Sequence, residues 1–479
     1  LHDLNIMFLY NQEQYDINGP TTLFSSLPQR KQGVAGRVSY SYDGRYYIEG
    51  NFGYNGSENF AKGHRFGFFP SIAVGYNISN EKFWQPIKPV ISNLKIRGSW
   101  GLVGNDATNA GRFAYMEDLV LGGSDSYTTG IRQDTYYSGP SWNRYFNPDL
   151  TWEVGEKINL GLDLQLFNDF NLTFDIFREK RRDIFMTREN SIPEIVGTGE
   201  TKITSNNGEM ENKGLDLAID YNKQITKDFF LSFKSTLTFA RNKVLKMDEP
   251  PYFEYPGLSD VGHPLGTYWG YVADGLFPDQ ETIDNSPRQD LGYTPQPGDI
   301  KYVNQPNAKG EYDNVINSND RVAIGHPYDP ELVYGFGPSM KWKNWDFSFF
   351  FQGVARTSFM MYGMHPFGTT SIKNMLQFVA DDHWSVDNPN PNAAYPRLTK
   401  DSNGNNDQYS TYWLRNAAFL KLKNAEIGYT YKGMRFYLSG VNLLTFSPFK
   451  HWDPEMGGGN GLYYPTQRVF NIGFQMTIQ

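Results

Sequence analysis

The chain has 479 residues and a formal net charge of −8, which argues against nucleic acid as a partner. It contains no cysteine, so disulfides and thiolate metal sites are excluded. The mean hydropathy is −0.56, and no run approaches the roughly 20 apolar residues that a spanning helix needs. Aromatic residues nevertheless make up 16% of the chain, which is high for a soluble domain.

Strict alternation of apolar and polar residues is the dominant pattern. In the segment 158–166, Leu160, Leu162 and Leu164 alternate with Gly161 and Asp163. A period of two is that of a strand whose two faces meet different surroundings. We expect such apolar residues to point outward into lipid, and the same expectation holds for Phe174, Phe349, Phe470 and Phe474.

Alternation and turn chemistry together predict fourteen strands in chain order. They lie near 3–16, 33–43, 45–56, 68–79, 92–103, 149–167, 170–186, 206–223, 228–243, 331–342, 345–356, 415–431, 434–446 and 467–478. Most of the short connections are turn formers, namely Asp43-Gly44, Asn168-Asp169, Thr226-Lys227, Lys343-Asn344 and Lys432-Gly433. The connection 80–91 is of middling length and contains Pro86 and Pro89.

If the short connections share one side, the long ones fall together on the other: 104–148, 187–205, 244–330, 357–414 and 447–466. Short turns on one side and long loops on the other are typical of an outer-membrane β-barrel. The sequence therefore predicts an all-β fold, a transmembrane antiparallel β-barrel. Tyr268–Val272 looks like a further strand, but counting it would break the alternation of sides, so we assign it to the long loop 244–330.

A soluble β-sandwich or propeller is the alternative fold, because its strands also alternate. The predicted strands are longer than such folds use, the loop lengths are one-sided, and no repeat of about 40–50 residues is found.

Several motifs carry a family resemblance over nearly the whole chain. They are Gly36–Tyr42 with Asp43–Tyr47, Phe66–Ser71, Leu94–Arg97 with Gly101–Asn105, Thr151–Glu153, Asn207–Met210 with Asn212–Gly214, Leu414–Asn416 with Leu420–Asn424, and Asn442–Thr445 with Trp452–Glu455. In these motifs and their order the chain resembles the C-terminal half of SusC-like (RagA-like) TonB-dependent transporters of Bacteroidota.

The resemblance implies that residues 1–479 are the C-terminal part of a 22-stranded barrel, whose lumen a plug domain fills. The plug, the TonB box and about eight strands are then expected upstream of Leu1. The chain alone is expected not to close, since an unpaired edge in lipid is costly.

The function implied by the resemblance is active nutrient import across the outer membrane of a Gram-negative bacterium. TonB would act on the N-terminal region that is missing here and so energise the uptake of oligosaccharides or peptides. A SusD-like surface lipoprotein would cap the barrel. Membrane lipid and lipopolysaccharide would surround it, and a dimer of transporter–lipoprotein pairs is the implied assembly. The alternatives are a passive barrel or glycan-binding surface adhesin without import, and a surface hydrolase.

The candidate ligand-binding residues are aromatic side chains and one directional donor in the predicted loops. They are Tyr136, Tyr137, Trp142, Arg144 and Trp384. Rings of this kind give sugars or peptides contact area at little entropic cost.

No catalytic site, metal or other cofactor is expected from the sequence. The histidines lack metal-ligand spacing, and the segment 303–320 lacks the closely spaced carboxylates of a calcium loop. Asp381, Asp382 and His383 are interpreted as a solvated loop cluster, and Asp453 with Glu455 as a loop anchor.

Overall fold

The computed structural model describes residues 1–107, 111–122, 126–188, 190–196, 203–362, 376–399 and 403–476. Its main element is an antiparallel sheet of fourteen strands. In order of pairing these are β1 (His2–Tyr15), β2 (Gln29–Tyr42), β3 (Tyr46–Ser57), β4 (Phe66–Asn77), β5 (Ile91–Asn105), β10 (Glu153–Leu166), β11 (Phe170–Thr187), β12 (Thr204–Thr226), β13 (Phe229–Lys246), β20 (Leu332–Trp342), β21 (Trp345–Ala355), β24 (Phe419–Tyr431), β25 (Met434–Phe446) and β26 (Val469–Met476).

All fourteen predicted strands are confirmed, most of them with small shifts at their ends. Two boundaries moved for a physical reason. The strand expected from 149 begins at Glu153, because Leu150 and Trp152 are buried in a small core with Phe60 and Ala114. The strand expected from 415 begins at Phe419, because the chain turns at 416–418, where the Ala418 N–H donates to the Asn416 side chain.

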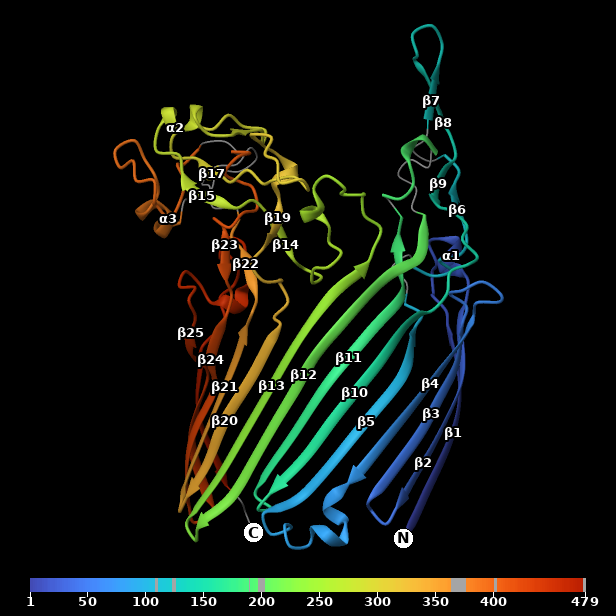
Figure 1. Cartoon of the computed structure of the whole chain (residues 1–479), viewed down its shortest axis with the longest axis vertical. Helices are drawn as coiled ribbons and strands as arrows, with labels where there is room; N and C mark the ends of the chain where they lie inside the picture. The colour runs from blue at the N-terminus through green and yellow to red at the C-terminus, as the bar shows by residue number, and fades with distance from the viewer. Residues whose placement is uncertain are drawn as a thin grey trace. The chain divides into compact units, whose positions relative to one another are not determined.

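The chain divides into two compact units. Unit 1 comprises Leu1–Leu215 and Asn242–Pro250, and unit 2 comprises Asp216–Arg241 and Pro251–Gln479. In unit 1 the strands β1–β5, β10 and β11 lie side by side, and between β5 and β10 the chain forms two small antiparallel pairs (Figure 1). These pairs are β6 (Asp118–Val120) with β9 (Ser141–Arg144), and β7 (Ser126–Thr129) with β8 (Thr135–Ser138).

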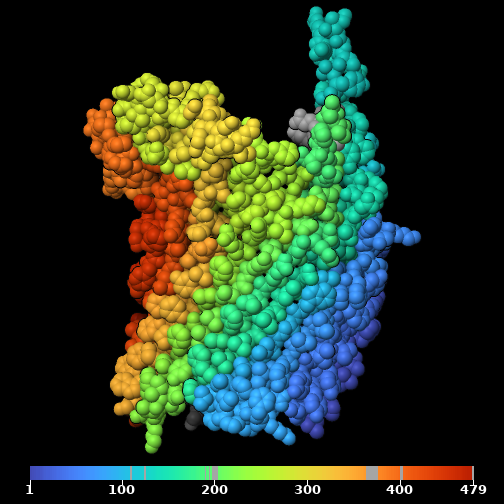
Figure 2. Space-filling view, in the orientation of Figure 1, coloured from blue at the N-terminus to red at the C-terminus, as the bar shows by residue number. Residues whose placement is uncertain are grey.

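In unit 2 the long connections fold into a layer of their own, which we call the loop layer (described residues of 251–331 and 356–418). Its strand pairs are β14 (Tyr268–Gly270) with β19 (Val322–Ile324), β15 (Ala273–Leu276) with β17 (Ile300–Tyr302), β16 (Arg288–Gln289) with β18 (Val315–Ile316), and β22 (Ser358–Met360) with β23 (Leu414–Asn416). Figure 2 shows the yellow and orange atoms of this layer gathered at one end of the orange and red strands of unit 2.

The short helices all lie in connections. They are α1 (Leu23–Ser26), α2 (Gln280–Asp284) and α3 (Gln377–Asp381), with 3-10 turns η1 (Ile78–Asn80), η2 (Lys82–Trp84), η3 (Glu194–Val196), η4 (Pro256–Leu258), η5 (Ser318–Asp320) and η6 (Pro454–Met456). The segment Tyr268–Gly270 pairs only within the loop layer, so the prediction that it does not belong to the large sheet is confirmed.

The register confirms that the sheet has an apolar and a polar face. In unit 1, Leu162 lies opposite Phe174 and Ile96. On the other face, Arg97 binds the carboxylates of Asp175 at 2.6 Å and Asp163 at 3.3 Å. Gly161 makes room for this arginine, because a Cβ there would lie 2.5 Å from the Arg97 Cζ.

Unit 2 repeats this arrangement. Ile427 lies opposite Phe347 and Leu438 on the apolar face. On the polar face, the Arg435 Nε donates to Asp346 at 3.1 Å, and a terminal nitrogen pairs with Glu426 at 2.5 Å. In each unit, therefore, an arginine on the polar face of the sheet has two carboxylate partners.

An arginine at Leu162 tests the expectation that the apolar face meets lipid. If Leu162 lies near the bilayer midplane, Leu162→Arg should lower the unfolding free energy of the vesicle-reconstituted protein by about 2–4 kcal/mol. The cost would be smaller if the residue lay closer to a membrane interface. Thr173→Arg, on the polar face opposite Asp163, is the matched control and should cost less than about 1 kcal/mol. Equal costs in denaturant titrations would contradict a lipid-facing Leu162.

Candidate functional site

The predicted aromatic residues of unit 1 lie on the two small strand pairs between β5 and β10. Tyr136 and Tyr137 belong to β8, and their side chains are 63% and 47% exposed. Tyr137 stacks on Tyr127 of β7 with 5.2 Å between ring centroids. Trp142 of β9 is 37% exposed and stacks on Tyr145 at 5.4 Å. Three aromatic faces are thus presented on a hydrogen-bonded hairpin framework.

Arg144, the directional donor predicted beside them, is built into the framework itself. It is buried, and its guanidinium donates to the carbonyl oxygens of Met116 at 2.8 Å and Phe113 at 3.2 Å. It also lies over the Phe24 ring at 4.9 Å. Burial lowers the pKa of Arg144. This residue therefore orients the β6·β9 pair that carries Trp142.

Trp384 belongs to unit 2, where it is buried in the core of the loop layer. Its ring covers Gly298, whose φ of +89° favours glycine and where a Cβ would lie 2.3 Å from the tryptophan ring. The structure thus gives Trp384 a packing contact rather than an exposed face. Ligand contact by any of the five predicted residues stays a prediction.

The loop layer has a hydrophobic core of its own, which the sequence analysis missed. Its buried side chains include Tyr271, Leu276, Ile300, Tyr302, Ile316, Ile324, Phe359, Met360, Met361, Val379, Tyr395 and Trp413. They come from strands of two to four residues, from helix α3 and from the connections between them, all too short for any periodicity to be visible in the sequence.

A buried polar cluster holds this core together. Asp299 is fully buried, and its Oδ1 accepts hydrogen bonds from Arg397 Nε at 2.7 Å, Asn403 Nδ2 at 3.0 Å and Asn406 Nδ2 at 2.9 Å. Its Oδ2 accepts from the Gln296 backbone N–H at 2.8 Å. The cluster joins the 296–299 turn to the 397–406 segment, about 100 residues later in the chain. The run Asn403-Gly404-Asn405-Asn406 was the sequence signal that could have revealed it.

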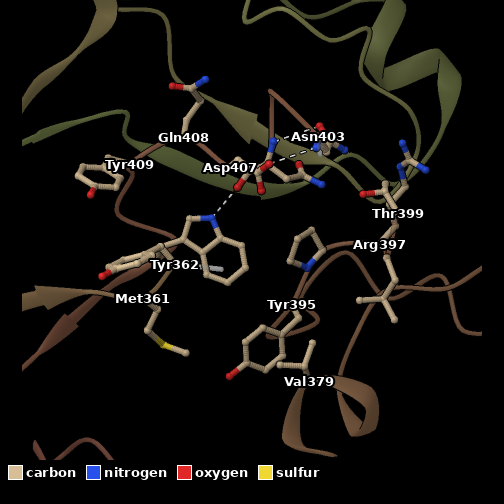
Figure 3. Close-up of a pocket in the computed structure, with 14 residues that line it drawn as sticks. Met361, Tyr362, Val379, Tyr395, Arg397, Thr399, Asn403, Asp407, Gln408 and Tyr409 are labelled. Carbon is tan, nitrogen blue, oxygen red and sulfur yellow. Dashed lines mark hydrogen bonds between the residues drawn. The ribbon is translucent and has the colours of Figure 1, made fainter. Parts of the chain in front are cut away.

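A pocket of about 250 Å³ opens beside this cluster (Figure 3). One side is aromatic and carries Tyr362, Tyr395, Tyr409 and Trp413, together with aliphatic Met361, Val379 and Leu398. The other side is polar, with Arg397, Thr399, Asn403, Asp407 and Gln408.

The polar groups of the pocket are largely engaged within the protein. Arg397 is held by Asp299 and by the Tyr293 hydroxyl at 2.6 Å, and the Trp413 indole N–H donates to the Asn406 carbonyl at 2.7 Å. Burial raises the pKa of Tyr395, so its hydroxyl stays neutral. Such a pocket offers flat apolar faces with a few fixed dipoles, which suits binding rather than acid–base chemistry.

A second buried ionic cluster anchors the connection after β25. Lys421 of β24 is fully buried and contacts Asp453 at 2.6 Å and Glu455 at 2.5 Å. Lys423 also contacts Glu455, at 2.6 Å. Burial opposes ionisation of the two carboxyls, but hydrogen bonds outweigh it and lower the pKa of both. Asp453 accepts from Lys421, the Glu455 backbone N–H and Thr466, and Glu455 accepts from Lys421 and Lys423. The interpretation of this acidic pair as a loop anchor is confirmed. Lys421 is the partner that the sequence analysis did not identify.

The remaining candidates form no catalytic arrangement in the part of the chain that the structure describes. Asp381 and Asp382 are exposed at the end of α3, and the His383 ring contacts the Ala380 carbonyl at 2.8 Å. Within the described ranges, no group of three or more His, Asp or Glu side chains is placed to hold a metal ion. Asp320 accepts instead from the backbone N–H groups of Gln305 and Asn317. No helix in the described ranges is long and apolar enough to traverse a bilayer.

Comparison with known proteins agrees with this architecture. The family model "TonB dependent receptor-like, beta-barrel" matches residues 2–443. TonB-dependent receptor P3 of Formosa agariphila is 27% identical over 478 residues, covering 92% of this chain and 45% of the relative. TonB-dependent receptor SusC of Bacteroides thetaiotaomicron is 29% identical over 468 residues, covering 92% and 43%.

Solved structures show the same fold. The RagAB peptide transporter matches with a TM-score of 0.74 at 21% identity, over 99% of this chain and 53% of that one. The RagAB peptide importer in its open-open state gives 0.76 at 20% identity, over 100% and 53%. The chain spans about half the length of the curated relatives it matches.

The family is one of transporters and receptors of the outer membrane, not of enzymes. With the match extending over 2–443, the chain belongs to the TonB-dependent receptor β-barrel family and resembles its SusC and RagA members.

Proposed function

We propose that the protein containing this chain imports oligosaccharides or peptides across the outer membrane, with energy delivered through TonB. The observation that carries the proposal is the family match along most of the chain, with SusC and RagAB among its relatives. RagAB is named a peptide transporter, and exposed aromatic rings suit sugar rings as well as peptides.

The long connections 104–148, 244–330, 357–414 and 447–466 are, in this proposal, the extracellular mouth of the barrel. A SusD-like surface lipoprotein caps this mouth, the wall is surrounded by lipid and lipopolysaccharide, and transporter–lipoprotein pairs form a dimer. The folded loop layer supports a docking role, because a rigid surface loses less entropy on binding than flexible loops do.

Uptake by cells that make the full-length protein separates active import from a passive barrel or adhesin. The protein is first purified with its associated lipoprotein, and the bound ligand is identified by mass spectrometry. Uptake of that ligand should stop when TonB is deleted or the proton-motive force is dissipated. Uptake that continues would favour the passive barrel, whereas surface binding without any uptake would favour the adhesin.

The exposed aromatics of unit 1 are proposed to touch the ligand directly. Tyr136→Ala and Trp142→Ala should each weaken binding of the co-purified ligand by about tenfold, because a ring buried by a ligand contributes about 1–2 kcal/mol. Leu121→Ala is the matched control, since Leu121 lies in the same connection and is 82% exposed but has no ring. Calorimetric titration of the purified complex measures all three, and unchanged affinity in both aromatic variants would remove them from the site.

A further inference from the structure

The connection between β4 and β5, together with the neighbouring turn after β10, differs from the other short turns in exposing large apolar side chains. Phe83 is 64% exposed, Ile87 41% and Val90 49%. Phe167, 56% exposed, lies beside them in the turn after β10, where its backbone N–H donates to the Val90 carbonyl at 2.9 Å. The turns Asp43-Gly44, Thr226-Lys227, Lys343-Asn344 and Lys432-Gly433 carry polar residues or glycine instead.

The backbone of this connection winds so that the apolar residues share a side. The N–H groups of Ile87 and Lys88 both donate to the Trp84 carbonyl, and those of Val90 and Ile91 donate to the Ile87 carbonyl. In such helical winding, residues 83, 87 and 90 have the i, i+4, i+7 spacing of one face. Lys82 and Lys88 are exposed on the same short segment.

The base of the connection is fixed to the apolar face of the sheet. Glu81 accepts hydrogen bonds from the hydroxyls of Tyr46 at 2.6 Å and Tyr76 at 3.2 Å, and pairs with Arg45 at 2.8 Å. The two tyrosines stack at 5.1 Å, and Tyr76 lies opposite Ile96 on the apolar face.

On the polar face, the Ser79 hydroxyl donates to the Asn93 side chain at 3.1 Å. Hydrogen bonds on both faces therefore hold the stem, and the apolar side chains project from a fixed base.

We propose that residues 82–90, with Phe167, are an interfacial lipid anchor. Phe83, Ile87 and Val90 enter the boundary between headgroups and acyl chains in the leaflet at the short-turn end of the strands, and Lys82 and Lys88 pair with phospholipid phosphates. The patch continues the apolar face that an outer-membrane barrel turns toward lipid. Its composition is that of segments that lie in a membrane interface.

A protein partner fits these observations less well. A stable protein interface uses about 20 residues a side, whereas this patch has four apolar side chains on two turns. The proposal depends on the membrane location of the family and not on what the protein transports.

Spin labelling tests the anchor directly, because none of the 479 residues is cysteine. Phe83→Cys and Ile87→Cys are made one at a time in the full-length protein, with any cysteine outside these residues replaced by serine. Each variant is labelled with a nitroxide and reconstituted into vesicles of phosphatidylethanolamine and phosphatidylglycerol. Lys227→Cys, in the exposed polar turn after β12, is the matched control. Power saturation compares collisions of each label with oxygen, which partitions into lipid, and with a water-soluble nickel chelate.

Labels at 83 and 87 should collide more with oxygen than with nickel, and the label at 227 should show the reverse order. Nickel-accessible labels at both 83 and 87 would place the connection in water and overturn the proposal. Labels shielded from both reagents would mean that another protein segment covers the patch, which overturns it equally. The second position gives an independent result should a label at 83 disturb the turn.

Discussion

Replacing Lys421 by methionine should open the connection after β25. The substitution keeps the length and packing of the side chain but leaves Asp453 and Glu455 without the buried cation that contacts both. Breaking a buried ion pair in this way costs about 3–5 kcal/mol, and we expect about 3 kcal/mol because the two carboxylates keep 21% and 24% of their side-chain surface exposed. Amide exchange of Glu455, Met456 and Gly457 should accelerate by about 100-fold.

Lys423→Met is the matched control, because Lys423 lies on the same strand, is 20% exposed and, among the ion pairs of the described residues, pairs with Glu455 alone. Its effect should stay below about 1 kcal/mol. Equal acceleration in the two variants would contradict a special role for the buried lysine.

The same exchange measurement has a defined dependence on pH. The folded-state pKa values of Asp453 and Glu455 lie below their ordinary values, because the hydrogen bonds to these carboxylates, including one from Lys421 to each, outweigh the burial that opposes ionisation. The stabilisation is therefore complete above the unfolded-state pKa values and is lost as the pH falls through the lower folded-state values. Lys421→Met should move this loss to higher pH, since burial raises the pKa of both carboxyls, and Asp453 then has no lysine partner while Glu455 keeps only Lys423.

Replacing Asp299 by alanine should open the loop layer of unit 2. The fully buried carboxylate accepts from Arg397, Asn403 and Asn406 on one oxygen and from Gln296 on the other. Its removal leaves the Arg397 guanidinium without its carboxylate and several buried donors unpaired, which costs about 3–5 kcal/mol. In limited proteolysis of the reconstituted full-length protein, both the 288–302 and the 403–413 segments should become cleavable.

Asp290→Ala is the control for this change, because Asp290 is 58% exposed and pairs only with exposed Arg288 among the ion pairs of the described residues. We expect a change within about 0.5 kcal/mol. Cleavage of one segment without the other in Asp299→Ala would show that the buried carboxylate does not join them.

The strands of the large sheet could be predicted because their information is local. Leu160, Leu162 and Leu164 alternate with polar partners along a single segment, and the turn residues that follow fix where each strand ends. Tyr268–Gly270 was also placed correctly outside the large sheet, although its residues favour a strand. The reason is that successive strands must place their connections on alternate sides, which is a constraint on the whole chain and not on one segment.

The contacts within the loops could not be predicted in this way. Arg144 was expected to face a ligand, but its guanidinium satisfies backbone carbonyls 28 and 31 residues earlier in the chain. Lys421 looked like one polar position in an alternating strand, and only the later Asp453 and Glu455 explain its burial. Trp384 has no neighbour in sequence that would reveal the glycine beneath it. Such pairings depend on tertiary contacts between segments far apart in the chain.

The contact of Trp384 with Gly298 has a consequence for exchanging loops between relatives. Any side chain at 298 would collide with the indole, and the neighbouring Asp299 depends on donors from 397–406. A graft of the 251–331 segment with another residue at 298 or 299 would therefore place that residue against a tryptophan and asparagines that do not match it. Exchanging both segments together keeps these contacts, so the two are best transplanted as one module.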